Sequence, residues 1–240
     1  DHIDFIFCFK TNDKNTLGFS PGGFLKILGE MAKWLTHGNS MISSTLSEAG
    51  GFLKTDQSLD RPDIQHHFVI GLIDDHLRKL HYGYGYSCHV CLLRPYSRGT
   101  VSLASAKYND APLINPNFLN DNRDIDTLIK GAKMTQNILN TPPLKKYQKR
   151  EIYGVHSNLT DKEWEQHIRN RADTIYHPVG TCKMGKGPLA VVNSSLKIRG
   201  LKNIRVADAS IMPTITSGNT NAPTIMIGEK CATMIMDVHR

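Results

Sequence analysis

The sequence lacks several patterns that would assign a function directly. No apolar run approaches the ~20 residues of a membrane-spanning helix, and no cationic stretch precedes an apolar segment as in a secretory signal. Cys88 and Cys91 form a CxxC pair, but a structural zinc site usually needs a second Cys or His pair, which is absent. In the strand expected around them the two cysteines point to opposite faces, so no metal site is predicted.

Two nucleotide-binding motifs are also incomplete. Gly83-Tyr-Gly85-Tyr-Ser-Cys88 supplies only the first two glycines of a GxGxxG motif. Residues 180–186 fit the first seven positions of a GxxxxGK phosphate loop, but Gly187 stands where the Mg²⁺-binding hydroxyl belongs. The following GPLAVVNSS does not have the pattern of a helix. Binding of a nucleotide triphosphate by a P-loop-like segment is therefore the weakest of the alternatives.

The composition is that of an ordinary globular protein. The 240 residues are 40% hydrophobic and 21% charged, which is enough to bury a sizeable core. The net charge of +7 comes from scattered basic residues, so no nucleic-acid partner is expected, and the densest run, residues 145–150, is interpreted as a solvated face. Five cysteines, an odd number in a chain too large to need disulfides, favour a reduced, cytoplasmic setting.

Hydrophobic periodicity predicts an α+β fold, mainly an antiparallel sheet flanked by helices. The capping box Thr160-Asp-Lys-Glu163 marks the start of one helix, and Pro223 suits the first turn of the last helix. The short turn PYSR predicts a hairpin between residues 84–93 and 98–105. The expected strands are 5–9, 63–71, 84–93, 98–105 and 203–207, and the expected helices are 21–36, 124–140, 160–171 and 223–238.

The stretch YHPVGTCKMG contains a candidate catalytic base, His177. Pro178 restricts His177 to an extended backbone, and a histidine near its usual pKa can take a proton at neutral pH. The sequence has 11 histidines, and residue type alone favours a packed or surface role. Downstream, a loop with Asn219 and Asn221 leads into a helix N-terminus, which suits a phosphate or an electron-rich ring. An ordinary helix cap explains the same residues.

Two ordered blocks of sequence carry a more specific signal. YHPVGTCKMG, followed by VVNSSLKIRGLKNIRVADASIMPTITSGNTNAPTIMIGEKCA, resembles the C-terminal signature of the glucose–methanol–choline (GMC) oxidoreductases, flavoproteins that oxidise alcohols. PDIQHHF, HVCLLRPYSRGTVSLAS and APLINPNFL are similar to the substrate domain of the choline dehydrogenase and bacterial FAD-dependent alcohol dehydrogenase branch. Asp1-His2-Ile3-Asp4 resembles the end of the family's LQDH element. The resemblance covers nearly the whole chain.

The resemblance implies a role for each matching residue. His177 corresponds to the base that takes the hydroxyl proton of the alcohol, whose hydride then passes to flavin N5. Asn221 corresponds to a His or Asn position that hydrogen-bonds the substrate oxygen. His67 matches a substrate-side histidine, although a one-residue shift would exchange it with His66, and His89 is interpreted as structural. The implied FAD contacts are Asp208 and Ala209 near the ribityl and phosphate, and Asn219 and Thr220 near the isoalloxazine.

The resemblance also implies a missing part. Family members bind the ADP half of FAD with an N-terminal Rossmann-like unit that carries GxGxxG, and that motif has no counterpart here. Because the sequence starts abruptly at Asp1, we expect a fragment. Residues 1–175 are expected to form the substrate-binding domain, and residues 176–240 the segment that returns to complete the FAD-binding domain. Such a fragment should bind FAD poorly and be inactive alone.

The implied substrate is a primary alcohol, either aliphatic or choline, which is oxidised to the aldehyde with a quinone-like or other electron acceptor. Choline requires aromatic or acidic groups around its quaternary ammonium, but a strand face explains the alternation of Tyr82, Tyr84 and Tyr86 equally well. A cytoplasmic protein, peripheral to the inner membrane, is compatible with this branch. The alternatives are a non-catalytic member of the fold, or a lyase-type member that keeps FAD without hydride transfer.

Overall fold

The computed structural model describes residues 1–238, which form two compact units. We call Asp4–Leu92 with Asn122–Asp173 the sheet unit. We call Asp1–Ile3, Leu93–Asp121 and residues 174–238 the C-terminal unit. Each unit is built from segments far apart in the sequence. Residues 93–121, which follow a central strand of the sheet, belong to the same unit as the C-terminal segment.

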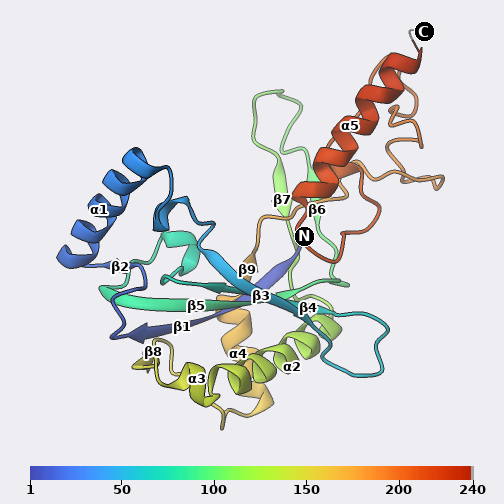
Figure 1. Cartoon of the computed structure of the whole chain (residues 1–240). Helices are drawn as coiled ribbons and strands as arrows, with labels where there is room; N and C mark the ends of the chain where they lie inside the picture. Colours follow the sequence, from blue (N-terminus) through green and yellow to red (C-terminus); the bar gives the residue numbers. More distant parts are fainter. Residues whose placement is uncertain (239–240) are drawn as a thin grey trace. The chain divides into compact units, whose positions relative to one another are not determined.

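A seven-stranded sheet forms the centre of the sheet unit (Figure 1). Its main order is β3–β4–β5–β1–β8, with β2 beside β5 and β9 beside β1. The pairs β3–β4, β4–β5, β2–β5 and β1–β8 are antiparallel, which confirms the expected fold class. The strands are β1 (Ile3–Thr11), β2 (Gly18–Phe19), β3 (Ser47–Leu53), β4 (Ile64–Val69), β5 (Gly83–Leu92), β8 (Arg150–Glu151) and β9 (Asp173–Thr174).

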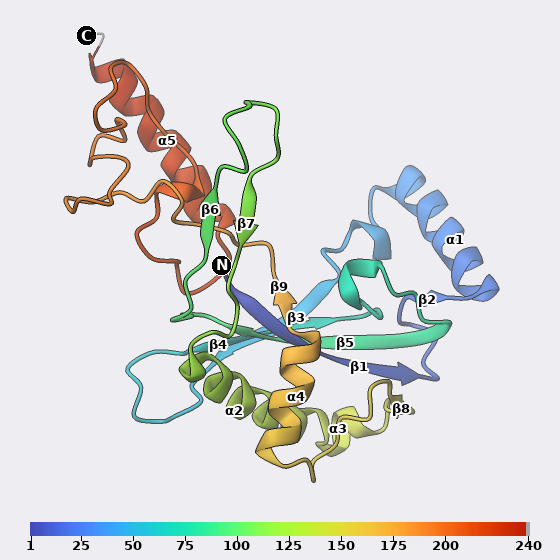
Figure 2. The ribbon, with the colours of Figure 1, turned by 180° about the vertical axis from the view of Figure 1, so that it is seen from behind.

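Helices α2 (Asn122–Leu139), α3 (Pro142–Lys145) and α4 (Asp161–Arg171) lie on one face of this sheet (Figures 1 and 2). Gly131 lets α2 approach the sheet closely, because a Cβ at this position would lie only 3.1 Å from Cγ1 of Val90. Helix α4 begins at the predicted capping box, in which the Thr160 and Glu163 side chains each accept a hydrogen bond from the other's backbone amide. Helix α2 was expected from the amphipathic pattern of residues 124–140, and α4 was expected from this capping box.

The core between the sheet and these helices is rich in aromatic rings. Trp164 of α4 is fully buried, and its ring meets those of Phe5 and Phe7 edge-on, with centroids 6.2 and 6.0 Å apart. Tyr86 is stacked between Phe9 and Phe68, with centroids 5.4 and 5.2 Å apart. Burying such large side chains supplies much of the hydrophobic stabilisation of a domain, and ring pairs add to it.

Helix α1 (Pro21–His37) is the helix predicted over residues 21–36. The Ser20 side chain accepts a hydrogen bond from the amide of Gly23, and Gly38 ends the helix in the left-handed region at φ 69°. Its apolar side chains are largely exposed, Leu25 to 68% and Leu35 to 74%. The sheet unit also contains the short 3-10 helices η1 (Met41–Ser43) and η2 (Asp75–Leu77).

The C-terminal unit contains little regular structure. Its elements are β6 (Thr100–Ser102), β7 (Leu113–Asn115), the 3-10 helix η3 (Ala209–Ile211) and helix α5 (Asn221–Val238). One apolar cluster holds the unit's loops together, because Ile211 of η3, Ile227 and Cys231 of α5, and Val192 of the connecting loop are all buried in it. Because the strands of this unit are short, apolar contacts and not ladders of backbone hydrogen bonds hold its long loops in place.

Two predictions about strands in this unit are wrong. Residues 98–105 do not form a hairpin with β5, because β5 pairs with β1, β2 and β4, and β6 pairs with β7. After Leu92 the chain instead leaves the sheet unit, and residues from Leu93 belong to the C-terminal unit. Residues 203–207 are not a strand, and only Arg205 makes an isolated bridge, to Lys197. Val206 packs against the apolar cluster around Val192, whereas Ile204 is 48% exposed.

Candidate active site

The candidate base His177 is buried in the C-terminal unit, with 8% of its surface exposed. Its backbone amide donates to Oδ1 of Asp1 over 2.9 Å, and the hydroxyl of Thr174 donates to Oδ2 of the same carboxylate over 2.6 Å. Tyr176, just before it, has a left-handed backbone with φ 65°. These contacts fix the chain on the N-terminal side of the motif, and Pro178 restricts it on the other side.

The imidazole of His177 contacts a second buried histidine, His2. The two Nδ1 atoms lie 2.9 Å apart, and the rings are edge to face, 5.1 Å between centroids at 85°. Nε2 of His2 lies 2.9 Å from the backbone carbonyl oxygen of Leu93. Burial lowers the pKa of His2 from 6.5 to about 4, with hydrogen bonds to the Leu93 and Thr216 backbone acting in the opposite direction and the charge of His177 acting with burial.

The rest of the YHPVGTCKMG motif runs beside the segment that follows Asp208. The amide of Cys182 donates to the carbonyl of Ser210 over 3.0 Å, and the amide of Met184 donates to that of Ile211 over 2.7 Å. A Cβ at Gly180, which has φ 89°, would lie 3.4 Å from the carbonyl oxygen of Met212. The two blocks that resemble the family signature are therefore adjacent in space, as parts of one site would be.

Residues predicted to contact FAD lie at two short turns of this unit. Oδ1 of Asp208 accepts a hydrogen bond of 2.7 Å from the amide of Ser210 and so caps η3, which begins at Ala209. Thr220 is 8% exposed, and its carbonyl accepts from the amide of Thr224 over 3.0 Å in the first turn of α5. Asn221 is the first residue of α5, two residues earlier than the predicted start at Pro223.

Arg94 connects the segment after β5 to the loop that carries Asn219. Its Nη1 donates to the hydroxyl of Ser217 over 3.1 Å. Because Leu93 contacts His2 and Arg94 contacts Ser217, consecutive residues reach toward both halves of the candidate site. Neither His2 nor Arg94 was singled out from the sequence. Their only signals were their places in two quoted blocks, DHID and HVCLLRP, that resemble the family.

His67, the predicted substrate-side residue, belongs to the sheet unit. On β4 it stands opposite Gly50 of β3 and His89 of β5. The neighbouring His66 faces α2, where its Nε2 lies 2.7 Å from the hydroxyl of Thr135. Since successive residues of a strand alternate between faces, His67 lies on the face away from α2. His66 is thereby occupied by a structural contact, which makes His67 the better candidate of the two.

His89, on the same face as His67, pairs with a carboxylate. Its Nδ1 lies 2.5 Å from Oδ2 of Asp4, and both residues are buried. Asp4 belongs to β1, the strand next to β5. This ion-pair geometry supports the interpretation of His89 as a residue that ties two central strands together.

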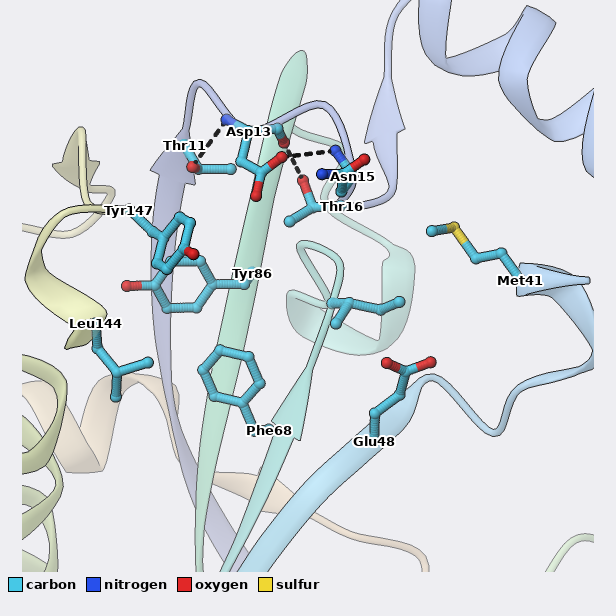
Figure 3. A pocket seen from close by; sticks show the side chains of 11 residues that line it. Thr11, Asp13, Asn15, Thr16, Met41, Glu48, Phe68, Tyr86, Leu144 and Tyr147 are labelled. Atoms are coloured by element: carbon cyan, nitrogen blue, oxygen red, sulfur yellow. Dashed lines mark hydrogen bonds between the residues drawn. The ribbon is translucent and has the colours of Figure 1, made fainter.

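The sheet unit also contains a pocket of about 430 Å³ (Figure 3). Phe68, Tyr86 and Tyr147 form much of its wall, and in the view of Figure 3 the carboxylate of Asp13 points down from above and that of Glu48 points up from below. None of the residues predicted to act on substrate or FAD lines it.

Residues 1–238 contain no group of three or more His, Cys, Asp or Glu side chains placed to hold a metal ion. All five cysteines are free thiols. Within the same part of the chain, no helix has both the length and the apolarity needed to cross a membrane. The segment after Lys186 is not helical up to η3, so the loop of residues 180–186 lacks the helix that a P-loop requires.

Comparison with known proteins identifies the family. Residues 95–228, more than half of the chain, match the C-terminal domain of GMC oxidoreductases, and the chain belongs to this family. An alcohol dehydrogenase (acceptor) of Pseudomonas putida is 45% identical over an alignment of 240 positions, which covers 98% of this chain and 43% of that protein. An oxygen-dependent choline dehydrogenase of Citrobacter koseri is 39% identical over 204 residues, 85% of this chain and 37% of that protein.

Solved structures agree with this assignment. A formate oxidase of Aspergillus oryzae superposes with a TM-score of 0.87 at 26% identity, over 100% of this chain and 46% of the oxidase. A pyridoxine 4-oxidase shares the fold with a TM-score of 0.79 at 24% identity, over 99% of this chain and 42% of that structure. The chain thus spans less than half the length of the relatives and structures that it matches.

Proposed function

We propose that this chain is the substrate-binding and C-terminal part of an FAD-dependent oxidoreductase that converts a primary alcohol to the aldehyde, with His177 as the base. The observation that carries the proposal is the state of His177. It is buried, its backbone is fixed on both sides, and its Nδ1 is held by another imidazole in the position that the family signature assigns to a base. A packed histidine without a chemical role would not need to match that signature.

The residues of the C-terminal unit fit an FAD that is held mainly by residues outside this chain. Helix α5 is 18 residues long, and amide groups at a helix N-terminus attract anions and electron-rich groups. Thr220 and Asn221 lie at this N-terminus, and the Thr224 hydroxyl donates to the Thr220 carbonyl over 2.7 Å, which fixes the turn. The left-handed Gly180 gives a backbone without a side chain in the adjacent loop. The formate oxidase relative is known to carry FAD.

In this proposal residues of this chain remove the hydroxyl proton of the substrate and stabilise the charge on its oxygen. His177 removes the hydroxyl proton, and its buried surroundings keep water away from the resulting alkoxide. The side-chain amide of Asn221 donates a hydrogen bond to the substrate oxygen as negative charge develops there. Bound FAD supplies the hydride acceptor. Asp208, Ala209, Asn219 and Thr220 contact the cofactor, and His67 contacts the substrate.

The choice between an aliphatic alcohol and choline follows the relatives. The relative with 45% identity is named for alcohol with a separate acceptor, and those near 39% are named for choline. We therefore propose an aliphatic primary alcohol first and choline second, with a quinone-like acceptor and peripheral membrane association as the finer parts of the proposal. A non-catalytic or lyase-type flavoprotein is the alternative, and it has no observation of its own in this structure.

The test uses the complete protein that contains this chain, loaded with FAD. Without oxygen, the parent, His177→Gln and the exposed-histidine control His156→Gln are mixed with a series of primary alcohols and choline. The proposal predicts rapid bleaching of the flavin absorbance in the parent and control, and bleaching slowed by about 10²–10⁴-fold in His177→Gln with unchanged FAD content. Bound flavin that no alcohol bleaches would favour the lyase-type alternative, and absence of flavin the non-catalytic one.

The finer parts of the proposal have separate readouts. Reoxidation of the reduced protein by a soluble quinone, compared with reoxidation by oxygen, identifies the acceptor. Sedimentation with vesicles of anionic lipid, with and without high salt, tests peripheral membrane association, because electrostatic attachment is weakened by salt. Reoxidation by oxygen alone would contradict the quinone-like acceptor.

A further inference from the structure

We infer that His2 is a positioning residue: it holds His177 in the tautomer with hydrogen on Nδ1, so that Nε2 carries the lone pair that takes the substrate proton. The inference rests on the proposed function for its catalytic meaning. It goes beyond that function because it assigns a role to a residue that neither the base nor the FAD contacts include. It follows from neighbouring groups of the C-terminal unit. The backbone of Leu93 and of Thr216 favours hydrogen on the His2 ring, and the ring of His2 contacts that of His177.

The first step concerns Nε2 of His2. It lies 2.9 Å from the carbonyl oxygen of Leu93, and a carbonyl oxygen can only accept a hydrogen bond. Nε2 of His2 therefore carries a hydrogen and donates it. His2 is fully buried, so water does not compete for this contact. One end of the imidazole is thus fixed as a donor by the backbone.

The second step concerns the other nitrogen of His2. A neutral imidazole has one donor and one acceptor nitrogen, so a neutral His2 that donates from Nε2 must accept at Nδ1. Burial, which lowers the pKa of His2 to about 4, keeps the ring neutral at neutral pH. The Asp1 carboxylate beside the pair accepts hydrogen bonds from the Thr174 hydroxyl and from the backbone amide of His177.

The third step concerns His177, whose tautomer follows from the acceptor at Nδ1 of His2. Its Nδ1 lies 2.9 Å from Nδ1 of His2, and two acceptors at that distance would repel each other. Nδ1 of His177 must therefore donate its hydrogen to His2. In neutral His177 the lone pair is then on Nε2, the nitrogen away from His2. When Nε2 takes a proton, Nδ1 keeps its hydrogen, and the bond to His2 becomes charge-assisted.

In many sites a carboxylate accepts a hydrogen bond from the catalytic histidine and so fixes its tautomer. Here His2 has that role, and it adds no negative charge. A carboxylate behind the base would stabilise its protonated form strongly and would be costly to bury beside an apolar substrate. A neutral imidazole fixes the tautomer and orientation and stabilises the imidazolium more weakly. His177 is consequently held ready to accept a single proton and to release it again after the reaction.

Three substitutions separate the two hydrogen bonds of His2. His2→Asn places a carbonyl oxygen where Nδ1 was, so it retains an acceptor for His177 and loses the donor to Leu93. His2→Gln places an amide where Nε2 was, so it retains the donor to Leu93 and loses the acceptor. His2→Phe loses both and keeps the ring shape. If His2 has only a structural role, His2→Gln and His2→Asn should have the same effect on the rate of flavin reduction. If His2 positions His177, only His2→Asn should retain most of the parent's rate.

The experiment uses the complete FAD-loaded protein with ¹⁵N-labelled histidine. In the parent, we expect the NMR signals of His177 to show hydrogen on Nδ1 and none on Nε2 at pH 7.5, and we expect His2→Gln to change this tautomer or mix the two forms. Flavin reduction by the fastest alcohol should slow by about 10²-fold in His2→Gln and His2→Phe, at the lower end of a general base's contribution, and by less than about tenfold in His2→Asn. The pH profile of the reduction rate should shift only in the first two.

Failure of this inference can be distinguished from failure of the proposed function. If the parent is reduced but His177 carries hydrogen on Nε2, or if His2→Gln leaves tautomer, rate and pH profile unchanged, the inference is wrong and the proposed function stands. If no alcohol reduces the parent, the proposed function is wrong, and with it the catalytic role of His2. Equal loss in Asn and Gln with an unchanged tautomer would leave His2 a packing residue and overturn the inference. The FAD content of each variant controls for misfolding.

Discussion

The sheet unit and the C-terminal unit both bury histidines, but they pair them differently. In the sheet unit, His89 contacts the Asp4 carboxylate and His66 contacts the Thr135 hydroxyl. In the C-terminal unit, His177 contacts the imidazole of His2. A carboxylate or a hydroxyl gives a buried histidine a hydrogen-bond partner, and this contact connects neighbouring strands and helices. Such a contact has a structural explanation and requires no catalytic role. Two imidazoles in contact tolerate only one positive charge, which suits a site where one proton comes and goes.

The largest expected difference between the two kinds of histidine is in catalysis. His177→Gln should slow flavin reduction by about 10²–10⁴-fold, because it removes the proposed base. His66→Gln should leave the rate within about threefold, because this residue faces α2 and contacts Thr135. Rapid-mixing measurements of flavin absorbance on the complete protein give both rates. A loss of rate in His66→Gln as large as that in His177→Gln would remove the functional distinction between the units.

The next largest effect concerns the cores of the two units. Trp164→Ala should destabilise the sheet unit by about 3–5 kcal/mol, since it empties the space between Phe5 and Phe7. Ile227→Ala should destabilise the C-terminal unit by about 2–4 kcal/mol, because Ile227 is buried in its apolar cluster. Hydrogen exchange followed by mass spectrometry reads each unit from its own peptides. If each substitution loosened both units equally, their separate cores would have to be regarded as one cooperative structure.

A third difference should appear in acid. The folded-state pKa of His2 is about 4 against 6.5 in the unfolded chain, so between these values the unfolded chain binds the extra proton. Stability of the C-terminal unit should be unaffected above pH 6.5 and should fall by roughly 3 kcal/mol as the pH drops to 4. His2→Gln should flatten this slope in peptides of residues 174–185. Burial also lowers the pKa of His66, so the sheet unit should keep its own acid sensitivity in that variant.

The sequence predicted the sheet unit better than the C-terminal unit for a physical reason. The Thr160 capping box, the periodicity of α2 and the alternation of β5 are local patterns, and regular hydrogen bonding follows from them directly. The prediction of a hairpin after β5 was wrong, because a turn pattern does not show whether the following strand pairs within the same sheet. Residues 203–207 alternate like a strand, but no neighbouring strand pairs with them beyond the bridge of Arg205.

The candidate site shows the same division. Motif resemblance led to the prediction of His177, Asn221 and Asp208 as site residues, because they stand within long, ordered blocks of sequence. It did not identify His2, which lies 175 positions from His177 and reaches it only through the tertiary fold. A contact between residues so far apart produces no recognisable local pattern in the sequence. The roles of the matched residues remain predictions that the experiments above test.

The smallest expected effect compares two side-chain caps, Thr160 in the sheet unit and Asp208 in the C-terminal unit. Thr160→Ala should destabilise α4 by about 1 kcal/mol and leave FAD affinity unchanged, because its cap is purely structural. Asp208→Asn keeps the cap of η3, since Asn also accepts from the Ser210 amide, but it removes the negative charge. Stability should then change by less than about 0.5 kcal/mol.

FAD affinity should separate these two caps. If the Asp208 carboxylate accepts hydrogen bonds from hydroxyls of the cofactor, Asp208→Asn should raise the dissociation constant of FAD by about tenfold, or ~1.4 kcal/mol, as expected for the loss of a charge-assisted hydrogen bond. Titration of the FAD-free complete protein, followed by flavin fluorescence, measures this constant. Unchanged affinity in Asp208→Asn would reduce Asp208 to a cap like Thr160. The difference between the units would then lie only in the pair of His2 and His177.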